Sequence, residues 1–125
     1  MKKIAKKDIT AVILAGGRSS RMHGKDKGLI DFRNKPMISY VFDVAIKHVA
    51  KVFISANRNK EIYAKYAEVV SDELADFQGP LAGILAVMKL CETPYLLVLP
   101  CDSPFINDNA INKLINSIIN SSFAI

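Results

Sequence analysis

Short apolar runs alternate along the chain with segments whose apolar residues recur three and four positions apart. The apolar runs show no polar alternation, which is typical of strands buried on both faces of a parallel sheet. They lie at residues 11–15, 52–56, 68–70 and 95–99. The helical spacing occurs at residues 37–48, 61–66, 81–90 and 108–120. The pattern therefore predicts strands that alternate with helices, with Asn107 as a favourable N-cap for the last helix.

This alternation limits the fold. Parallel neighbours in a sheet need long crossover connections, which are usually helices and nearly always right-handed. We therefore predict an α/β domain with three layers, αβα, in which helices cover both faces of a Rossmann-like, mostly parallel sheet.

Proline and glycine indicate how two of the helices begin and pack. Pro36 and Pro80 suit the first helical position, where a backbone N–H has no partner within the helix. The helix after Pro80 is apolar nearly all round, so we expect it to be deeply buried. Gly83, with Ala82 and Ala86 beside it, would let this helix approach the sheet closely.

The positive charge of the chain is concentrated at its start. Lys and Arg total 17 against 12 Asp and Glu, for a formal net charge of +5. Most of the excess comes from Lys2, Lys3, Lys6 and Lys7. We therefore divide the chain into a basic tail, residues 1–8, and a nearly neutral domain, residues 9–125. Near-neutrality disfavours nucleic acid as a partner, and no apolar run reaches the roughly 18 residues that a membrane span needs.

The cysteine and histidine content argues against a disulfide framework and against a zinc site. Cys91 and Cys101 lie beside apolar segments, and two cysteines are too few for a framework. We interpret them as reduced thiols in or near a core, which is typical of a cytoplasmic protein. His23 and His48 are far apart and have no cysteine at metal-ligand spacing.

A glycine turn follows the first apolar run. Gly16 and Gly17 lack a Cβ, so their backbone N–H groups can converge on an anion. The loop after them carries cationic side chains that can neutralise phosphate groups. These side chains belong to Arg18, Arg21, Lys25 and Lys27. The stretch predicts a phosphate-binding site.

Polar residues also follow the other predicted strands. Asn57 and Arg58 come directly after the second strand, Asp72 after the third and Asp102 after the fourth. Because ligands of open α/β sheets bind beyond the carboxyl ends of the strands, we expect these residues to share one rim with the glycine turn. Carboxylates beside phosphate-binding groups are typical of a site for a nucleotide with Mg²⁺, which is the cofactor we predict.

Two common nucleotide-binding motifs are absent. The Walker pattern requires Ser or Thr after its Gly-Lys pair, whereas Asp26 follows Lys25. The dinucleotide fingerprint G-x-G-x-x-G is not matched by residues 16–21. The site is therefore neither a P-loop nor an ordinary NAD-binding turn.

Residues 14–28 resemble the L-A-G-G-x-S-x-R-M-G-x-D-K signature of nucleotidyltransferases. Further blocks occur in the order of one branch, at residues 56–58, 72–76, 79–83 and 100–104. That branch is the molybdenum cofactor guanylyltransferases, and the resemblance covers residues 9–120. One position departs from the signature, because His23 stands where the family usually has a glycine.

The resemblance implies the fold of nucleotide-diphospho-sugar transferases, incomplete at the C-terminal side, with the acceptor-binding part beyond residue 125. It implies a Mg²⁺-dependent transfer of GMP from GTP to the terminal phosphate of the molybdopterin-bound molybdenum cofactor, with release of pyrophosphate. Arg21, Lys27 and Asp102 would be the catalytic residues, and Asp102 would hold the metal. The residues that would bind GTP are Leu14, Ala15, Gly16, Gly17, Lys27, Asn57, Asp72, Gly79, Gly83 and Asp102.

The resemblance also implies partners. They are GTP and molybdenum-molybdopterin as substrates and, transiently, metal-insertion proteins and molybdoenzyme chaperones, with no nucleic acid and no membrane. Two alternatives stay open: a cytidylyl- or sugar-1-phosphate nucleotidyltransferase, and a non-catalytic nucleotide-binding fragment. Residues 16–17 and 57–58 favour the guanylyl branch, because cytidylyl relatives tend to have Ala at the first of the two glycines.

Overall fold

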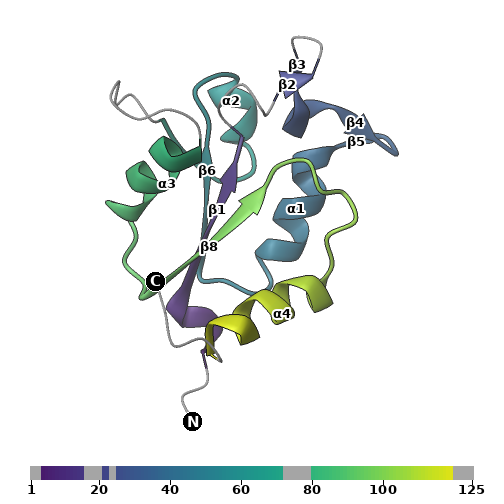
Figure 1. Ribbon diagram of the computed structural model, residues 1–125. Coiled ribbons are helices and arrows are strands. Elements are labelled where there is room, and N and C mark those ends of the chain that lie inside the picture. The colour runs from purple at the N-terminus through teal and green to yellow at the C-terminus, as the bar shows by residue number, and fades with distance from the viewer. Residues whose placement is uncertain (1–3, 16–20, 23–24, 72–79, 120–125) are drawn as a thin grey trace.

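The computed structural model describes residues 4–15, 21–22, 25–71 and 80–119. At its centre is a sheet of four parallel strands in the order β7-β6-β1-β8 (Figure 1). The strands are β1 (Ile9–Leu14), β6 (Lys51–Ser55), β7 (Glu68–Val70) and β8 (Tyr95–Pro100). Each strand coincides with one of the predicted apolar runs to within two residues at either end. The predicted α/β class with a parallel sheet is confirmed.

Helices cover both faces of the sheet. The helices α1 (Met37–Ala45) and α4 (Asp108–Ile119) lie on one face, and α3 (Pro80–Met88) lies on the other (Figure 1). A single turn, α2 (Lys60–Tyr63), joins β6 to β7. The shorter elements are η1 (Lys6–Asp8), β2 (Arg21–Met22), β3 (Lys25–Asp26), η3 (Lys27–Leu29), β4 (Asp31–Phe32) and β5 (Lys35–Pro36). None of the described helices is long and apolar enough to cross a membrane.

Successive residues of β1 are buried in two different hydrophobic clusters. Ile13 belongs to the main core with Ile38 of α1 and Ile111 of α4. Val12, the residue before it, packs with Val87 of α3 in a smaller cluster. Because side chains alternate across a strand, a run that is apolar at every position supplies both faces. This explains why β1 carries no polar alternation.

Both ends of α1 differ from the prediction, whereas the start of α4 agrees with it. The helices α2 and α3 also end earlier than predicted, at Tyr63 and Met88. The helix α1 ends at Ala45 instead of His48, and the following residues form a turn. Pro36 is the N-cap of α1, not its first helical residue, because it also pairs with Asp31 in the β4–β5 hairpin. The N-cap predicted at Asn107 is confirmed, since its Oδ1 accepts the N–H of Ala110 at 2.9 Å.

The prediction that the helix after Pro80 is deeply buried is wrong for one of its sides. Ala82 and Val87 of α3 are buried, but Leu81 is 52% exposed and Met88 is 50% exposed. The reason is geometric, because α3 lies on the sheet with one side only, and that side alone is covered. The small-residue side packs as predicted: a Cβ added at Gly83 would lie only 3.1 Å from the Cβ of Ser55.

Candidate functional site

The sheet has a topological switch point between β1 and β8. The chain continues from β1 to β6 and β7 on one side, and then returns to place β8 on the other side of β1. Leu14, the last residue of β1, lies opposite Pro100, the last residue of β8. In open α/β sheets ligands bind beyond the carboxyl ends of the strands at such a point. The segments that leave it here are residues 15 onward and residues 101 onward.

Lys27 and Asp102 meet at this point. The Nζ atom of Lys27, in η3, lies 3.8 Å from Oδ2 of Asp102, which follows β8. Their side chains are 28% and 36% exposed, so both are accessible to a ligand. This distance is longer than a direct N–H···O hydrogen bond, so the ammonium group does not donate a hydrogen bond to this carboxylate. Two residues predicted from separate motifs thus form one ion pair.

The residue beside Asp102 is a buried thiol. Cys101 is buried and free, and Cys91 is also a free thiol, as expected for the two cysteines. Burial, followed by the nearby charge of Asp102, raises the pKa of the Cys101 thiol to about 11. The Cys101 thiol is therefore protonated at neutral pH. The charged group at the end of β8 is the carboxylate of Asp102.

Asn57 and Ala15 lie at the same edge of the sheet. Asn57 follows β6, and its Oδ1 accepts a hydrogen bond from Oγ of Ser71, the residue after β7, at 2.9 Å. The backbone N–H of Ala15 donates to the carbonyl of Ser55 at 2.8 Å. That N–H is therefore committed to the sheet, and it is not the group by which Ala15 would hold a nucleotide. Leu14, before it, is half-buried.

Gly83 is adjacent to the site through packing. A side chain at this position in α3 would collide with Ser55 and contact Leu14, the last residues of β6 and β1. Its absence allows α3 to lie close to the carboxyl ends of the two strands. The predicted contact of Gly83 with GTP stays a prediction.

Several predicted site residues lie outside the described part of the chain. They are Gly16, Gly17, Asp72 and Gly79. The backbone of Arg21 pairs with Asp26 in the β2–β3 hairpin, but the position of its side chain is also outside that part. The roles predicted for these residues stay predictions.

Sequence reasoning missed Asp26, although the residue is part of the quoted signature. Its side chain is only 4% exposed. The Nδ2 of Asn59 donates to Asp26 Oδ2 at 2.6 Å, and Nη2 of Arg58 lies 3.8 Å from Asp26 Oδ1. A carboxylate directly before Lys27 thus reaches the loop that begins with Asn57. The acidic residue type was visible in the sequence, but its burial was not.

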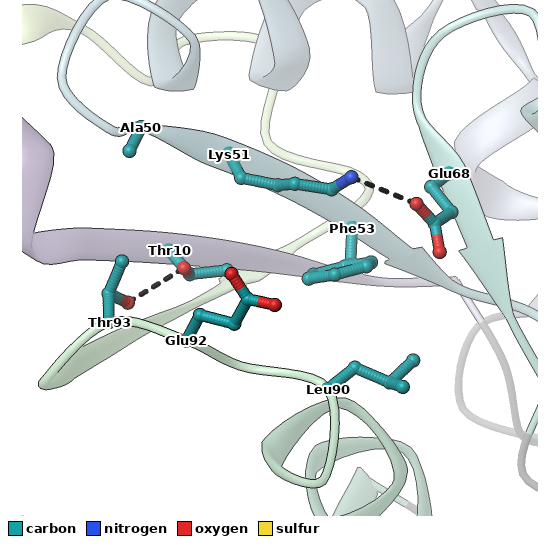
Figure 2. Close-up of a pocket in the computed structure, with 8 residues that line it drawn as sticks. All are labelled: Thr10, Ala50, Lys51, Phe53, Glu68, Leu90, Glu92 and Thr93. Carbon is teal, nitrogen blue, oxygen red and sulfur yellow. Dashed lines mark hydrogen bonds and ion pairs between the residues drawn. The ribbon is translucent and has the colours of Figure 1, made fainter.

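A cavity lies away from this edge. It has a volume of about 380 Å³ and is lined at its polar side by Thr10, Lys51, Glu68 and Thr93 (Figure 2). Lys51 and Glu68 are the first residues of β6 and β7, and Thr93 precedes β8. The cavity therefore belongs to the amino ends of the strands, opposite the Lys27–Asp102 pair.

Comparison with known proteins places this arrangement in a family. Residues 11–125 match the model of the MobA-like NTP transferase domain. The chain belongs to this family. The MobA-like match includes both ends of the Lys27–Asp102 pair and the loop that starts at Asn57. The family resemblance inferred from the sequence is confirmed.

Curated relatives of this MobA-like chain include molybdenum cofactor guanylyltransferases. It is 50% identical over 108 residues to a molybdenum cofactor guanylyltransferase of Ralstonia pickettii, covering 86% of this chain and 53% of the relative. It is 47% identical over 111 residues to one of Mannheimia succiniciproducens, covering 88% and 58%. The chain thus spans about half the length of the curated relatives it matches.

A solved structure supports the fold. The MobA-like chain superposes on CMP:2-keto-3-deoxy-manno-octonic acid synthetase complexed with CTP with a TM-score of 0.72 and 24% identity. The match covers 92% of this chain and 48% of the other. At this identity the likeness establishes the fold alone.

Proposed function

We propose that this chain is the nucleotide-binding part of a molybdenum cofactor guanylyltransferase. It would transfer GMP from GTP to the terminal phosphate of the molybdopterin-bound cofactor and release pyrophosphate. The observation that carries the proposal is the meeting of Lys27 and Asp102 at the switch point between β1 and β8. The name shared by the curated relatives supports the choice of GTP and of the acceptor.

The reaction asks mainly for positioning and for neutralisation of charge. An oxygen of the acceptor phosphate forms a bond to the α-phosphorus of GTP, and the bond from that phosphorus to the bridging oxygen breaks. The electron pair leaves with pyrophosphate. Lys27, whose ammonium is accessible beside Asp102, would stabilise the charge that develops on the leaving pyrophosphate. The predicted role of Arg21 on the triphosphate would be of the same kind.

The residues present fit a Mg²⁺ ion that is shared with the nucleotide. Among the described residues, no group of three or more His, Cys, Asp or Glu side chains could form a metal cage. Mg²⁺, however, is commonly bound by one or two carboxylates together with phosphate oxygens, and the accessible Asp102 offers such a ligand. The ion, when bound, would neutralise charge on the phosphates.

Asn57 and Asp72 would bind the guanosine portion, while Leu14, residues 15–17, Gly79 and Gly83 would surround the nucleotide. The location we propose is the cytoplasm, consistent with the free thiols of the described residues. Transient partners would be metal-insertion proteins and molybdoenzyme chaperones.

Thermal unfolding with a panel of nucleotides tests the choice of substrate. A ligand at about 100 times its dissociation constant stabilises the folded state by about 2.7 kcal/mol. For a domain of this size that corresponds to a rise of several degrees in Tm. We expect GTP with Mg²⁺ to raise the Tm more than CTP, UTP or ATP at equal concentration. Equal shifts for all four nucleotides would contradict the guanylyl assignment, and a larger shift with CTP would favour the cytidylyl alternative.

Two variants test whether the GTP-dependent rise in Tm arises from binding at Lys27. Lys27→Ala should lose most of the GTP-dependent rise in Tm. Lys89→Ala, at an exposed position beyond α3, removes the same charge and should keep the full rise. Equal losses in the two variants would show that the response reflects overall charge and not this site.

A further inference from the structure

The carboxylate of Asp26 is buried in a way that requires an explanation. Its side chain is 4% exposed, although a charged group taken out of water is strongly unfavourable unless it is paired. Both oxygens have partners: Oδ2 accepts from Nδ2 of Asn59 at 2.6 Å, and Oδ1 lies 3.8 Å from Nη2 of Arg58. The two partners are adjacent in the chain, so both oxygens of the carboxylate hold one loop.

The conformation of Asn59 also indicates that its contact with Asp26 holds this loop. Asn59 is the N-cap of α2, a position where an asparagine side chain usually accepts a hydrogen bond from the first turn of the helix. Its side chain makes no such capping bond and donates to Asp26 instead. The backbone is held at φ 55°, in the left-handed region that few residue types adopt. The contact with Asp26 thus takes precedence over the usual helix cap.

Asp26 also fixes the position of its neighbour. Lys27 follows it directly and reaches Asp102 at the end of β8, while Asp26 reaches the loop at the end of β6. In the sheet β6 and β8 lie on opposite sides of β1. Two consecutive residues therefore tie together the loops on both sides of the strand that leads into the glycine turn.

We propose that Asp26 is a positioning residue: it fixes the loop of residues 57–59 relative to Lys27, so that both can bind one nucleotide. The inference rests on the proposed function, in which Asn57 binds the guanosine portion and Lys27 the triphosphate of one GTP. Asp26 would not touch the nucleotide. It would set the distance between the residues that bind the two ends of the nucleotide.

The test uses substitutions that remove each side of the contact. Asp26→Ala removes the carboxylate, and Asp26→Asn is a milder variant in case the first does not fold. Asn59→Gly removes the amide without strain, because glycine adopts a positive φ readily. Asp31→Asn, an exposed carboxylate in β4, is the matched control. Far-UV circular dichroism and a cooperative melt establish that each variant is folded at the temperature of the assay.

The first readout is the affinity for GTP with Mg²⁺, measured by calorimetric titration. We expect Asp26→Ala and Asn59→Gly each to weaken binding about tenfold or more, as for the loss of a hydrogen bond to a charged group. Because both act through one contact, the double variant should bind no more weakly than the worse single variant. Asp31→Asn should bind as the wild type does. Effects of the two substitutions that multiply, or wild-type affinity in Asp26→Ala, would overturn the proposal.

The second readout needs no nucleotide. Backbone hydrogen exchange at residues 62–64, whose N–H groups bond to carbonyls of residues 59 and 60, should be faster in Asp26→Ala than in Asp31→Asn. Unchanged exchange would mean that Asp26 does not hold the loop, even if GTP binds. If the wild type does not bind GTP, the proposed function fails, and exchange still decides whether Asp26 orders this loop.

Discussion

Replacing Gly83 by alanine separates packing from helix propensity. On an exposed helix position, Gly→Ala stabilises by about 1 kcal/mol because the chain loses less backbone freedom. At Gly83 the added Cβ would lie 3.1 Å from the Cβ of Ser55 and 3.6 Å from Cδ2 of Leu14, and it would meet Oγ of Ser55. Neither strand end can retreat easily, because both belong to the parallel sheet.

The collision should therefore exceed the gain in propensity. Overpacking of this kind costs about 1–3 kcal/mol, and we expect Gly83→Ala to be less stable than the wild type. The assay is urea unfolding followed by circular dichroism at constant temperature. Ser55→Ala, which removes the Oγ in the way of the new Cβ, should restore part of the loss in the double variant.

A Gly83→Ala protein that is more stable than the wild type by about 1 kcal/mol would refute this reasoning, because helix propensity alone would then explain the result. A loss of stability that Ser55→Ala does not relieve would place the strain elsewhere. Either outcome would remove the structural role that we assign to Gly83 at the ends of β1 and β6.

Three further predictions concern stability. The hydroxyl of Tyr63 is buried with no hydrogen-bond partner among the described atoms, and burial, followed by the charge of Asp26, raises its pKa. Tyr63→Phe should therefore keep the free energy of unfolding or raise it by up to about 1 kcal/mol, and a clear loss of stability in urea would contradict this. Asn107→Ala should lower it by about 1 kcal/mol, because it removes the cap on α4; an unchanged urea midpoint would contradict the capping role. Hydrogen bonds from His48, then from Lys47, lower the pKa of Asp108. The stabilisation of the fold by the ionised Asp108 is therefore complete above the ordinary carboxyl pKa, and it is lost as the pH falls through the lowered pKa. The difference in urea midpoint between the wild type and Asp108→Asn should therefore shrink between pH 7 and pH 3; a constant difference would count against the interaction.

The strands could be predicted from the sequence because burial on both faces leaves a direct signature. The run at residues 11–15 has no polar position, and in the structure Val12 and Ile13 enter different clusters. The proximity of Lys27 and Asp102 could be predicted for a related reason. Residues that follow parallel strands meet at one edge, whatever their separation in sequence.

Other features could not be predicted because they depend on what covers a residue. The helix α3 is apolar nearly all round, yet Leu81 is half-exposed, since sequence hydrophobicity does not reveal how many sides of a helix are packed. Asp26 is an acidic residue in a polar loop, which suggests a solvated side chain. Its partner Asn59 lies 33 residues away, and no local pattern connects the two.

The most direct test of the proposed site is a crystal structure of the protein with GTP and Mg²⁺. We expect the triphosphate to lie beyond the carboxyl ends of β1 and β8, with Lys27 Nζ within hydrogen-bonding distance of a phosphate oxygen and Mg²⁺ between Asp102 and the phosphates. A nucleotide bound elsewhere, such as in the cavity that Lys51 and Thr93 line at the amino ends of the strands (Figure 2), would contradict it.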